Sequence, residues 1–408
     1  MQIKKAFKFE LIPNGEHIRK MKQFCGCSRF VFNHALDCQN KQYEAGNGFK
    51  FCYSKISSLL PKWKDEFKWL KDCHSQVLQQ SLKDLEASFR NFFAKRSSFP
   101  KFKKKGLKES FRFPQGVKLE QGNNRLYLPK IGWVRYRNSR HVIGSINNVT
   151  ISHKCGKWYV AIQTEYDVEP PIPLGNEVGI DMGITRFATL SNGQYFEPIN
   201  SFKTAQRQLA KLQCQMSHKR PLSHNWKKAK NKVSRLHSRI ANIRRHYLHQ
   251  LSAQISKNHA IVYVEDLQVG HISKSAKGDT THPGKRVKQK SGLNRSMLDQ
   301  SWYEFRRQLD YKLLWRGGHL VAVNPKNTSR TCPQCGHISA QNRQTQSNFE
   351  CVACGYKLNA DEVGAINILR AGCARLACEV NDAVRSSATG THRSELAILL
   401  NTVGIPAL

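Results

Sequence analysis

Four cysteines in the last third of the chain have the spacing of a zinc site. They form two Cys-x-x-Cys pairs, each followed by a glycine, and 15 residues separate Cys335 from Cys351. Thiolates at Cys332, Cys335, Cys351 and Cys354 can surround one Zn²⁺ as a tetrahedron. The alternative, two unrelated pairs of buried thiols, leaves the repeated pattern without a reason. We therefore predict one structural Zn²⁺ in a zinc ribbon at 332–354.

Three acidic residues stand where an isolated negative charge is unusual. Asp181 lies within an apolar segment between Gly179 and Gly183, Glu265 ends a second apolar segment, and Asp361 opens a helical pattern after the last cysteine. Because an unpaired charge in a buried strand is costly, we expect the three carboxylates to converge on cations. The alternatives are three unrelated surface acids or, for Asp361 alone, a helix-terminus charge.

A cluster of three carboxylates suits Mg²⁺, which prefers oxygen ligands. Two such ions ~4 Å apart can activate a water molecule and stabilise the leaving oxygen of a phosphodiester. We therefore predict that Asp181, Glu265 and Asp361 are both the Mg²⁺ ligands and the catalytic residues of a two-metal site. Asp266, beside Glu265, is expected to cap a helix or face solvent instead.

The charge of the chain indicates the partner. With 66 Lys+Arg against 29 Asp+Glu, the formal net charge is +37 over 408 residues, which favours a polyanion. The sequence has neither a long apolar run nor a signal-peptide pattern, so we expect no membrane partner. An odd total of 13 cysteines argues against a secreted disulfide framework and predicts a cytoplasmic protein with reduced thiols.

Two basic stretches stand out. The 67 residues 198–264 contain no Asp or Glu, and their apolar residues recur at spacings of three and four. This pattern predicts two long helices with a basic outer face that lies along a phosphate backbone. Residues 273–295 contain seven Lys/Arg, three Gly and one Pro without an apolar period, which predicts a mobile basic loop.

The elements that must position these residues follow from the apolar periods. Residues 3–11 alternate as a strand, 16–95 have helical spacing, and short alternating segments from 111 to 162 predict a small β-barrel that the first strand completes. After the proline-rich segment 169–173 the pattern becomes α/β. In chain order, this part has a strand with Asp181, a hairpin, two helices, a strand that ends on Glu265 and a helix that begins with Asp361. This order predicts an RNase-H-like nuclease fold.

The chain resembles the TnpB family, the RNA-guided nucleases of bacterial insertion sequences and small relatives of type V CRISPR effectors. The resemblance spans about residues 1–370, in the family's order. Its motifs are Cys27-Ser-Arg-Phe-Val-Phe-Asn33, Phe99-Pro-Lys-Phe-Lys-Lys, Leu128-Pro-Lys-Ile-Gly-Trp-Val, Gly179-Ile-Asp-Met-Gly-Ile, Val264-Glu-Asp-Leu, Thr328-Ser-Arg-Thr-Cys-Pro-Gln-Cys-Gly and 351–368. The last motif departs from one common family form, which has an asparagine two residues after the aspartate, whereas here Val363 and Gly364 follow Glu362.

The resemblance implies a multidomain α+β architecture. A split oligonucleotide-binding-like barrel, or wedge, is expected at 1–13 and 107–172, with a helical recognition lobe at 14–106 inserted into it. A RuvC nuclease domain is expected at 173–331 and 355–372 around the zinc ribbon, followed by a flexible tail at 373–408. The family's RuvC triad corresponds to Asp181, Glu265 and Asp361.

The resemblance also implies a mechanism. A monomer near the bacterial nucleoid would bind guide RNA from the transposon end, recognise a short motif in double-stranded target DNA, and cut both strands in turn at one RuvC site. The loop 273–295 would gate that site. The alternatives are a transposase with the same triad, a guide-dependent DNA-binding regulator that does not cut, and a zinc-ribbon RNA-binding structural protein.

Two groups of residues are candidates for nucleic-acid contacts. For the DNA motif they are Tyr53, Gln76, Gln79 and Gln80, because Gln can pair bidentately with adenine, although a solvated helix face is the plain alternative. For RNA phosphates they are Lys101, Lys103, Lys104 and Lys105 in a basic turn with Phe99 and Phe102, although a solvated connector would have the same composition.

Overall fold

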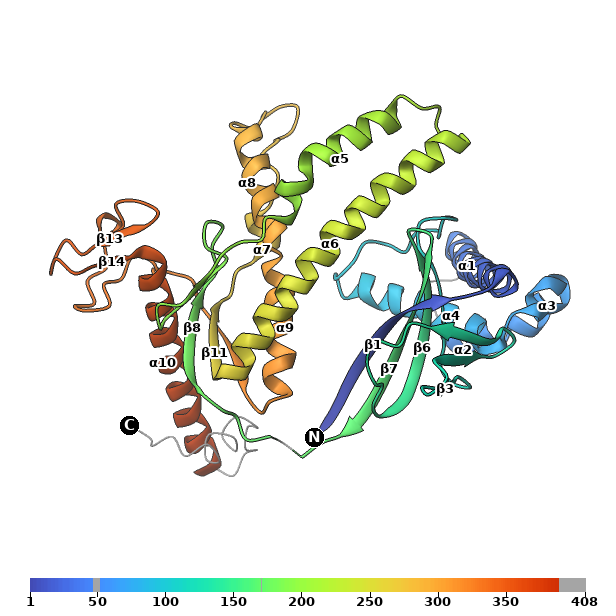
Figure 1. Ribbon diagram of the computed structural model, residues 1–408, viewed down its shortest axis with the longest axis horizontal. Helices are drawn as coiled ribbons and strands as arrows, with labels where there is room; N and C mark the ends of the chain where they lie inside the picture. Colours follow the sequence, from blue (N-terminus) through green and yellow to red (C-terminus); the bar gives the residue numbers. More distant parts are fainter. Residues whose placement is uncertain (47–51, 170, 389–408) are drawn as a thin grey trace. The chain divides into compact units, whose positions relative to one another are not determined.

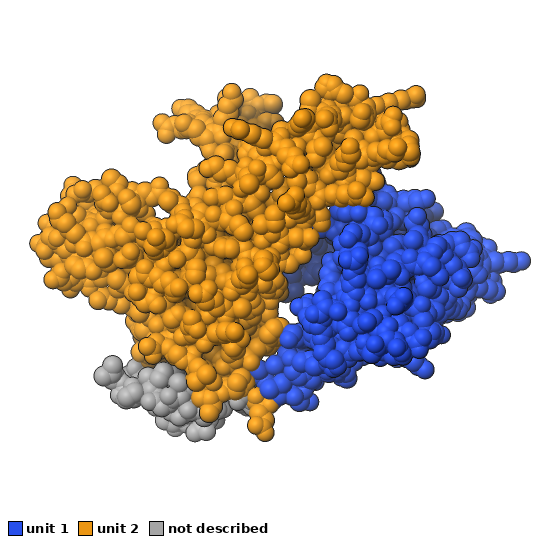
Figure 2. Space-filling view, in the orientation of Figure 1, with its two compact units in different colours: residues 1–168 blue, residues 169–408 orange. Residues whose placement is uncertain are grey.

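The chain folds into two compact units, Met1–Val168 and Glu169–Leu408 (Figure 2). The computed structural model describes residues 1–46, 52–169 and 171–388. The boundary after Val168 lies close to the predicted boundary after residue 172. Among the described residues, no helix is long and apolar enough to cross a membrane.

The first unit is built on a seven-stranded antiparallel sheet in the order β2-β6-β7-β1-β5-β4-β3 (Figure 1). Its long central strand β1 pairs with β7 from Gln2 to Leu11 and then with β5. In β1, Phe7, Phe9 and Leu11 alternate with more exposed residues, as the sequence predicts. The strands are β1 (Gln2–Ile12), β2 (Glu109–Phe113), β3 (Lys118–Glu120), β4 (Arg125–Leu128), β5 (Gly132–Tyr136), β6 (Ser145–Lys154) and β7 (Lys157–Asp167).

This sheet does not confirm the predicted barrel. β2 and β3 are the edge strands, and no pairing joins them in the described part of the unit. Short β3 was not predicted.

Helices of the first unit share one hydrophobic core with the sheet. α1 begins after Asn14, whose side-chain oxygen accepts the backbone N–H of His17 at 2.8 Å and so caps the helix. Phe24 of α1 contacts Phe111 and Phe113 of β2, which fixes the helix against the sheet. The helices are α1 (Gly15–Glu44), α2 (Tyr53–Ser57), α3 (Leu60–Glu66), the 3₁₀ turn η1 (Lys68–Asp72) and α4 (Ser75–Phe93).

The second unit has a five-stranded sheet in the order β10-β9-β8-β11-β12. β8, β11 and β12 are parallel, whereas β9 and β10 form an antiparallel hairpin beside β8. The predicted order of strand, hairpin and later strands is therefore present. The strands are β8 (Asn176–Asp181), β9 (Ala188–Leu190), β10 (Tyr195–Phe196), β11 (His259–Glu265) and β12 (His319–Val323).

Helices cover both faces of this sheet (Figure 1). Val262 and Val264 of β11 share a core with α6 and α9, whereas Ile261 and Tyr263 share one with α10. A strand that is buried on both faces has a continuous run of apolar residues, and residues 260–264 of β11 form such a run. The helices are α5 (Ser201–Ser217), α6 (His224–Asn258), α7 (Val269–Ile272), α8 (Val287–Gln300), α9 (Trp302–Leu314) and α10 (Ala360–Ala388). The cysteine-rich insertion contains η2 (Ala340–Asn342), β13 (Asn348–Glu350) and β14 (Lys357–Asn359).

Two loop predictions are wrong in part. Helix α10 continues to Ala388, so 373–388 are helical and not a tail, because Leu376 is buried in the same cluster as Ile368. The rest of the predicted tail, 389–408, lies outside the described residues. Of the predicted loop 273–295, residues from Val287 belong to α8, which Asn294 ties to the backbone oxygen of Ser273 at 2.8 Å.

Glycines allow α10 to approach the sheet closely. A Cβ atom at Gly179 of β8 would lie 2.2 Å from the backbone oxygen of Ala365, and one at Gly364 would lie 2.9 Å from Oδ2 of Asp181. Both distances are far below an ordinary contact, and neither glycine has a positive φ. At Gly179 the obstacle is backbone, so space requires glycine there, whereas a Cβ atom at 364 would press on the carboxylate of Asp181.

Candidate active site and zinc ribbon

The three predicted acids meet at one edge of the second sheet. Ile180 and Val264 are partners in the parallel ladder of β8 and β11, so Asp181 and Glu265, the next residues, both lie at carboxyl ends of strands. Asp361 is in the first turn of α10, which packs on β8. The carboxyl edge of a parallel sheet is the usual place for a ligand site.

Burial and mutual repulsion make this cluster electrostatically unfavourable without a cation. Burial, and then the charges of Glu265 and Asp361, raise the pKa of Asp181 to about 7. Burial also raises the pKa of Glu265 and that of Asp361. Like charges gathered in a buried place require neutralisation by protons or cations. The donor set consists of carboxylate oxygens, so it fits hard cations such as Mg²⁺.

Glu265 is oriented by groups that are distant in the sequence. The Thr328 hydroxyl donates to Oε1 of Glu265 at 2.6 Å and lowers the pKa of this carboxyl. The side-chain amide of Asn367 donates to the backbone oxygens of Thr328 and Thr331 at 2.8 and 2.7 Å. Asn367 of α10 thus fixes the turn at Thr328, and Thr328 in turn orients the carboxylate of Glu265.

Arg343, from the cysteine-rich insertion, supplies positive charge to the acid cluster. Its Nη2 atom lies 3.8 Å from Oδ1 of Asp361, and its charge lowers the pKa of Asp181, Glu265 and Asp361. The same nitrogen donates to the backbone oxygen of Gln346 at 3.1 Å, which restrains the guanidinium. Asp266, in contrast, is more than half exposed and pairs with Arg306 at 2.6 Å, in agreement with its exclusion from the metal site.

The four cysteines form one compact cluster, with all sulfur atoms within 4.8 Å of one another. The Sγ atoms of Cys332 and Cys354 are 3.6 Å apart, as are those of Cys335 and Cys351. Four sulfurs ~2.3 Å from a tetrahedral Zn²⁺ lie about 3.8 Å from one another, so this set fits zinc and is too wide for disulfides.

Both cysteine knuckles have the same backbone hydrogen bonds. Gly336 and Gly355 each donate to the oxygen of the first cysteine of the pair, at 3.0 and 2.9 Å. These glycines have φ values of 75° and 73°. Glycine adopts this left-handed conformation without steric strain, which explains why a glycine follows each cysteine pair. Burial opposes ionisation of the Cys351 thiol, but backbone N–H groups of Cys354 and Ala353 outweigh it and lower its pKa to about 6. A readily ionised thiol is a good zinc ligand.

The ribbon core continues into the first turn of α10. Ala360 and Val363 are buried in one cluster with Cys332, Phe349 and Cys351. Strand β14 ends at Asn359, immediately before α10, and the Asn359 side chain accepts the backbone N–H of Asp361 at 3.0 Å. The fold of the ribbon therefore determines where Asp361 begins the helix.

Comparisons with known proteins identify the family of the chain. Residues 160–276 match a family described as "Probable transposase", and 302–368 match a "Cas12f1-like, TNB domain". The Escherichia coli (strain K12) protein named "Putative RNA-guided DNA endonuclease InsQ" is 56% identical over 376 residues, 91% of this chain and 93% of that protein. The chain belongs to the TnpB family, which includes the IS605 OrfB proteins.

Two further matches to this TnpB-family chain cover all or most of its length. A protein of Streptomyces pristinaespiralis with a similar description is 32% identical over 100% of this chain and 99% of its own. The cryo-EM structure of the Cas12f1–sgRNA–target DNA complex has the same fold, with a TM-score of 0.53 and 12% identity, and covers 90% of this chain and 98% of that one. Residues 1–48 match a "Helix-turn-helix domain", but their described part forms strand β1 and the single helix α1.

The residues predicted to read DNA lie on neighbouring helices of the first unit. Tyr53 begins α2, and Lys83 of α4 lies over its ring at 5.3 Å. On α4, Gln79 is exposed, whereas Gln76 and Gln80 are partly buried. Of the three glutamines, Gln79 is the most exposed.

The four lysines predicted to contact phosphate do not form one group. Lys101, Lys104 and Lys105 are exposed, and none has an ion pair among the described residues. Lys103 is different: its Nζ lies 3.8 Å from the centre of the Phe32 ring, and burial lowers its pKa. Lys103 therefore packs against α1, and its contact with phosphate stays a prediction, as it does for the other three lysines.

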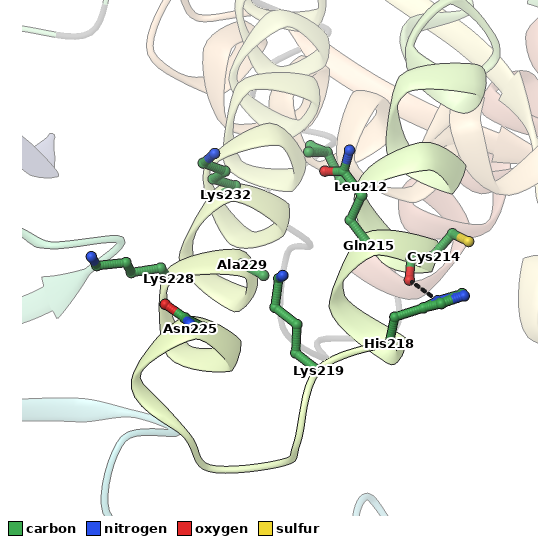
Figure 3. Close-up of a pocket in the computed structure, with 9 residues that line it drawn as sticks. All are labelled: Leu212, Cys214, Gln215, His218, Lys219, Asn225, Lys228, Ala229 and Lys232. Atoms are coloured by element: carbon green, nitrogen blue, oxygen red, sulfur yellow. Dashed lines mark hydrogen bonds between the residues drawn. The ribbon is translucent and has the colours of Figure 1, made fainter.

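The acid-free stretch folds as the two predicted helices, α5 and α6, which pack through Leu209, Val233, Leu236 and Ile240. Near the turn that joins them, a pocket of about 650 Å³ is lined by Lys219, Lys228 and Lys232 (Figure 3).

Three residues that support the acid cluster were not predicted from the sequence: Arg343, Thr328 and Asn367. Thr328 and Asn367 fall within motifs of the family resemblance, but nothing in those motifs indicates that they orient Glu265, and no motif includes Arg343.

Loss of a zinc ligand should disturb the ribbon and the acid cluster together. We expect Cys351→Ser to reduce zinc content and to lower the melting temperature by about 5 °C or more, because zinc binding contributes folding free energy. DNA cleavage should fall in parallel, since Asp361 and Arg343 depend on the ribbon. Elemental analysis, thermal unfolding and a cleavage assay measure the three effects, with the exposed Cys214→Ser as control. Full activity in zinc-free protein would contradict the assignment.

Neutralising Asp181 should stabilise the protein when Mg²⁺ is absent. Folding raises its pKa from 3.8 to about 7, so the stability lost to its charge builds up between about pH 4 and pH 7 and is constant at higher pH. In buffer without Mg²⁺ and without chelator, which would also remove zinc, we expect Asp181→Asn to increase the free energy of unfolding by about 1–3 kcal/mol at pH 8, and by less at pH 5.

The matched control is Asp299→Asn, at a buried aspartate that pairs with Arg244 at 3.3 Å and accepts the Phe202 N–H at 2.9 Å. This variant should be destabilised, because its charge has partners. Thermal unfolding of both variants in this Mg²⁺-free buffer gives the comparison. Destabilisation of Asp181→Asn at pH 8 would show that repulsion does not dominate the acid cluster.

Proposed function

We propose that this protein is an RNA-guided DNA endonuclease that cuts its target at a single acidic site. The observation that carries the proposal is the convergence of Asp181, Glu265 and Asp361 in a chain that is 56% identical to the Escherichia coli relative. The proposed partners are a guide RNA from the transposon end and double-stranded target DNA, and the net charge of +37 suits both. We propose that it acts as a monomer near the nucleoid.

The finer architecture belongs to the same proposal. We assign the second unit to an RuvC-type, RNase-H-like domain, since a hairpin lies antiparallel beside β8 and the parallel strands β11 and β12 lie on its other side. We assign the sheet of the first unit to the split barrel, or wedge, and α1 to α4 to the recognition lobe. The loop before α8 would gate the site.

Asp181, Glu265 and Asp361 would hold two Mg²⁺ ions. Bound Mg²⁺ supplies an activated water molecule and stabilises the leaving oxygen of the phosphodiester. Thr328 occupies one side of Glu265 and thereby fixes the direction of its carboxylate. Arg343 carries a guanidinium at the edge of the cluster, where it would bind a phosphate oxygen of the strand being cut.

A transposase is the second candidate, because one matching family is described as "Probable transposase". It would share the triad and Mg²⁺ but would join DNA ends and would not need a guide. A regulator without cleavage is disfavoured because all three carboxylates are present and converge. A purely structural RNA-binding role leaves the raised pKa of Asp181 without a purpose. Protein purified with its RNA, incubated with Mg²⁺ and plasmids with or without a matching target, separates these functions.

Single alanine substitutions at Asp181, Glu265 and Asp361 should each lower cleavage by about 1,000-fold or more and leave RNA and target binding nearly unchanged. The reason is that the three acids act in the chemical step. Cleavage kinetics and binding to labelled target check both statements. Asp266→Ala, beside the site but paired with Arg306, should keep most of the activity. A triad variant that cuts at near the wild-type rate would remove that residue from the mechanism.

Recognition of the target-adjacent motif is assigned to Tyr53, Gln76, Gln79 and Gln80. We expect Gln79→Ala to relax the motif at one base pair, with a loss of discrimination of about 1–3 kcal/mol, because a bidentate contact is lost. A depletion assay on a library of target-flanking sequences measures this. Lys101→Ala is the contrast, since loss of a phosphate contact should weaken binding without altering the motif. An unaltered motif for Gln79→Ala would assign Gln79 to the solvated face of α4.

A further inference from the structure

A groove in the first unit has features that the proposed reading of the target does not use. It lies between α1, η1 and the segment 99–105 and has a volume of about 660 Å³. Its lining includes Arg29, Phe30, His34, Trp69 and Phe102, and we refer to these residues as the aromatic groove. This volume is within the range of small-molecule sites.

The aromatic groove exposes rings that a core would bury. Trp69 is 42% and Phe102 is 49% exposed, although both line the same groove. Behind Trp69, Phe30 meets its ring edge-on at 4.9 Å and stacks on His34 at 5.4 Å. Trp69 is thus backed by a packed aromatic cluster and offers the rest of its surface to a planar ligand.

Phe102 is held in place by its neighbour. The Asn33 side chain donates to the backbone oxygen of Lys103 at 3.0 Å and accepts the N–H of Lys103 at 2.7 Å. Lys103 itself packs on Phe32. The segment is therefore anchored to α1 at one residue, and Phe102 beside it stays at the groove without being buried.

Charge around the aromatic groove favours a nucleic-acid strand. Lys101, Lys104 and Lys105 are exposed on the same segment, and Arg29 lines the groove without an ion pair in the described chain. Exposed aromatic rings with phosphate-binding cations on both sides form a stacking platform for unpaired bases. Asp37 is the acidic lining residue, and Lys41 neutralises it at 2.8 Å.

We propose that the aromatic groove binds an unpaired base of the RNA that the protein carries, stacked on Trp69 and Phe102, with Lys101, Lys104 and Lys105 on the adjoining phosphates. The inference rests on the proposed function for the identity of that RNA. RNA is chosen because target DNA enters as a duplex without unpaired bases, whereas a folded guide RNA has loops and bulges.

The test uses full-length protein and its co-purified RNA carrying a photo-reactive uridine analogue. We expect crosslinks in the peptides that contain Trp69 and Phe102. Affinity is measured in parallel at high salt, where phosphate contacts contribute little and stacking persists. Phe102→Ala should weaken RNA binding there by about 5- to 100-fold, the range for loss of one stacked base. Phe93→Ala, a 58% exposed phenylalanine outside the groove, should stay within about twofold of wild type.

A second variant fills the groove without removing any ring. A Cβ atom at Gly26 in the groove would meet only the flexible end of Arg29, at 3.9 Å, so Gly26→Leu is compatible with α1. It should abolish the Trp69 and Phe102 crosslinks and weaken RNA binding as Phe102→Ala does. Gly15→Ala, with open space around it, is the control for substitution of a helical glycine.

Three results would overturn the proposal: unchanged affinity in both groove variants, crosslinks confined to the lysines, or a larger loss for single-stranded DNA than for RNA. The last result would assign the groove to a displaced DNA strand. The failure of the proposed function is a separate result. It would be seen as an absence of guided cleavage by wild-type protein, whatever the crosslinks show.

Discussion

The close approach of helix α10 to strand β8 is the constraint on which the candidate site depends. It exists because Gly179 places no side chain between the two backbones, and Gly364 leaves room for the side chain of Asp181. The contact places Asp361 near Asp181, and the parallel pairing of β8 with β11 adds Glu265. The result is a buried cluster of like charges, which is unfavourable for the folded chain alone and becomes favourable when cations are bound.

The zinc ribbon and the acid cluster form one structural system. Ala360 and Val363 of α10 pack inside the ribbon, Asn359 of β14 caps Asp361, and Arg343 reaches the acids from the same insertion. Zn²⁺ bound at the four cysteines would contribute folding free energy to a small insertion that has only a small hydrophobic core. That free energy would also fix the start of α10. A structural metal site would thus determine the geometry at which the catalytic cations would bind.

The first unit combines rigid anchoring with exposed recognition groups. Its core joins the sheet with α1 and α4, so the residues that face solvent are held on a stable support. Lys103 packs on Phe32 and fixes the segment to α1, whereas the exposed lysines beside it remain available to phosphates. Such preorganisation lowers the entropy lost on binding.

Local sequence patterns determined the chemistry and most of the elements. The cysteine spacing indicated the ribbon, and the acids Asp181 and Glu265 were recognisable because each stands at the end of an otherwise apolar strand. Alternating apolar residues predicted β1, which is buried on one face, and a continuous apolar run predicted β11, which is buried on both. Apolar residues at spacings of three and four predicted the helices α5 and α6. Composition identified nucleic acid as the partner, since net charge needs no tertiary structure.

Tertiary structure alone decided which distant groups serve the site. Arg343 lies 18 positions from Asp361 and 162 from Asp181. Thr328 bonds to Glu265 across 63 positions, and Asn367 acts on Glu265 only through the turn that contains Thr328. The spacing of apolar residues does not reveal such pairs. The length of α10 and the start of α8 were also tertiary outcomes, because burial against the sheet and a bond from Asn294 extend helices that local composition would end. The close approach of Gly364 to the side chain of Asp181 is likewise visible only in the folded chain.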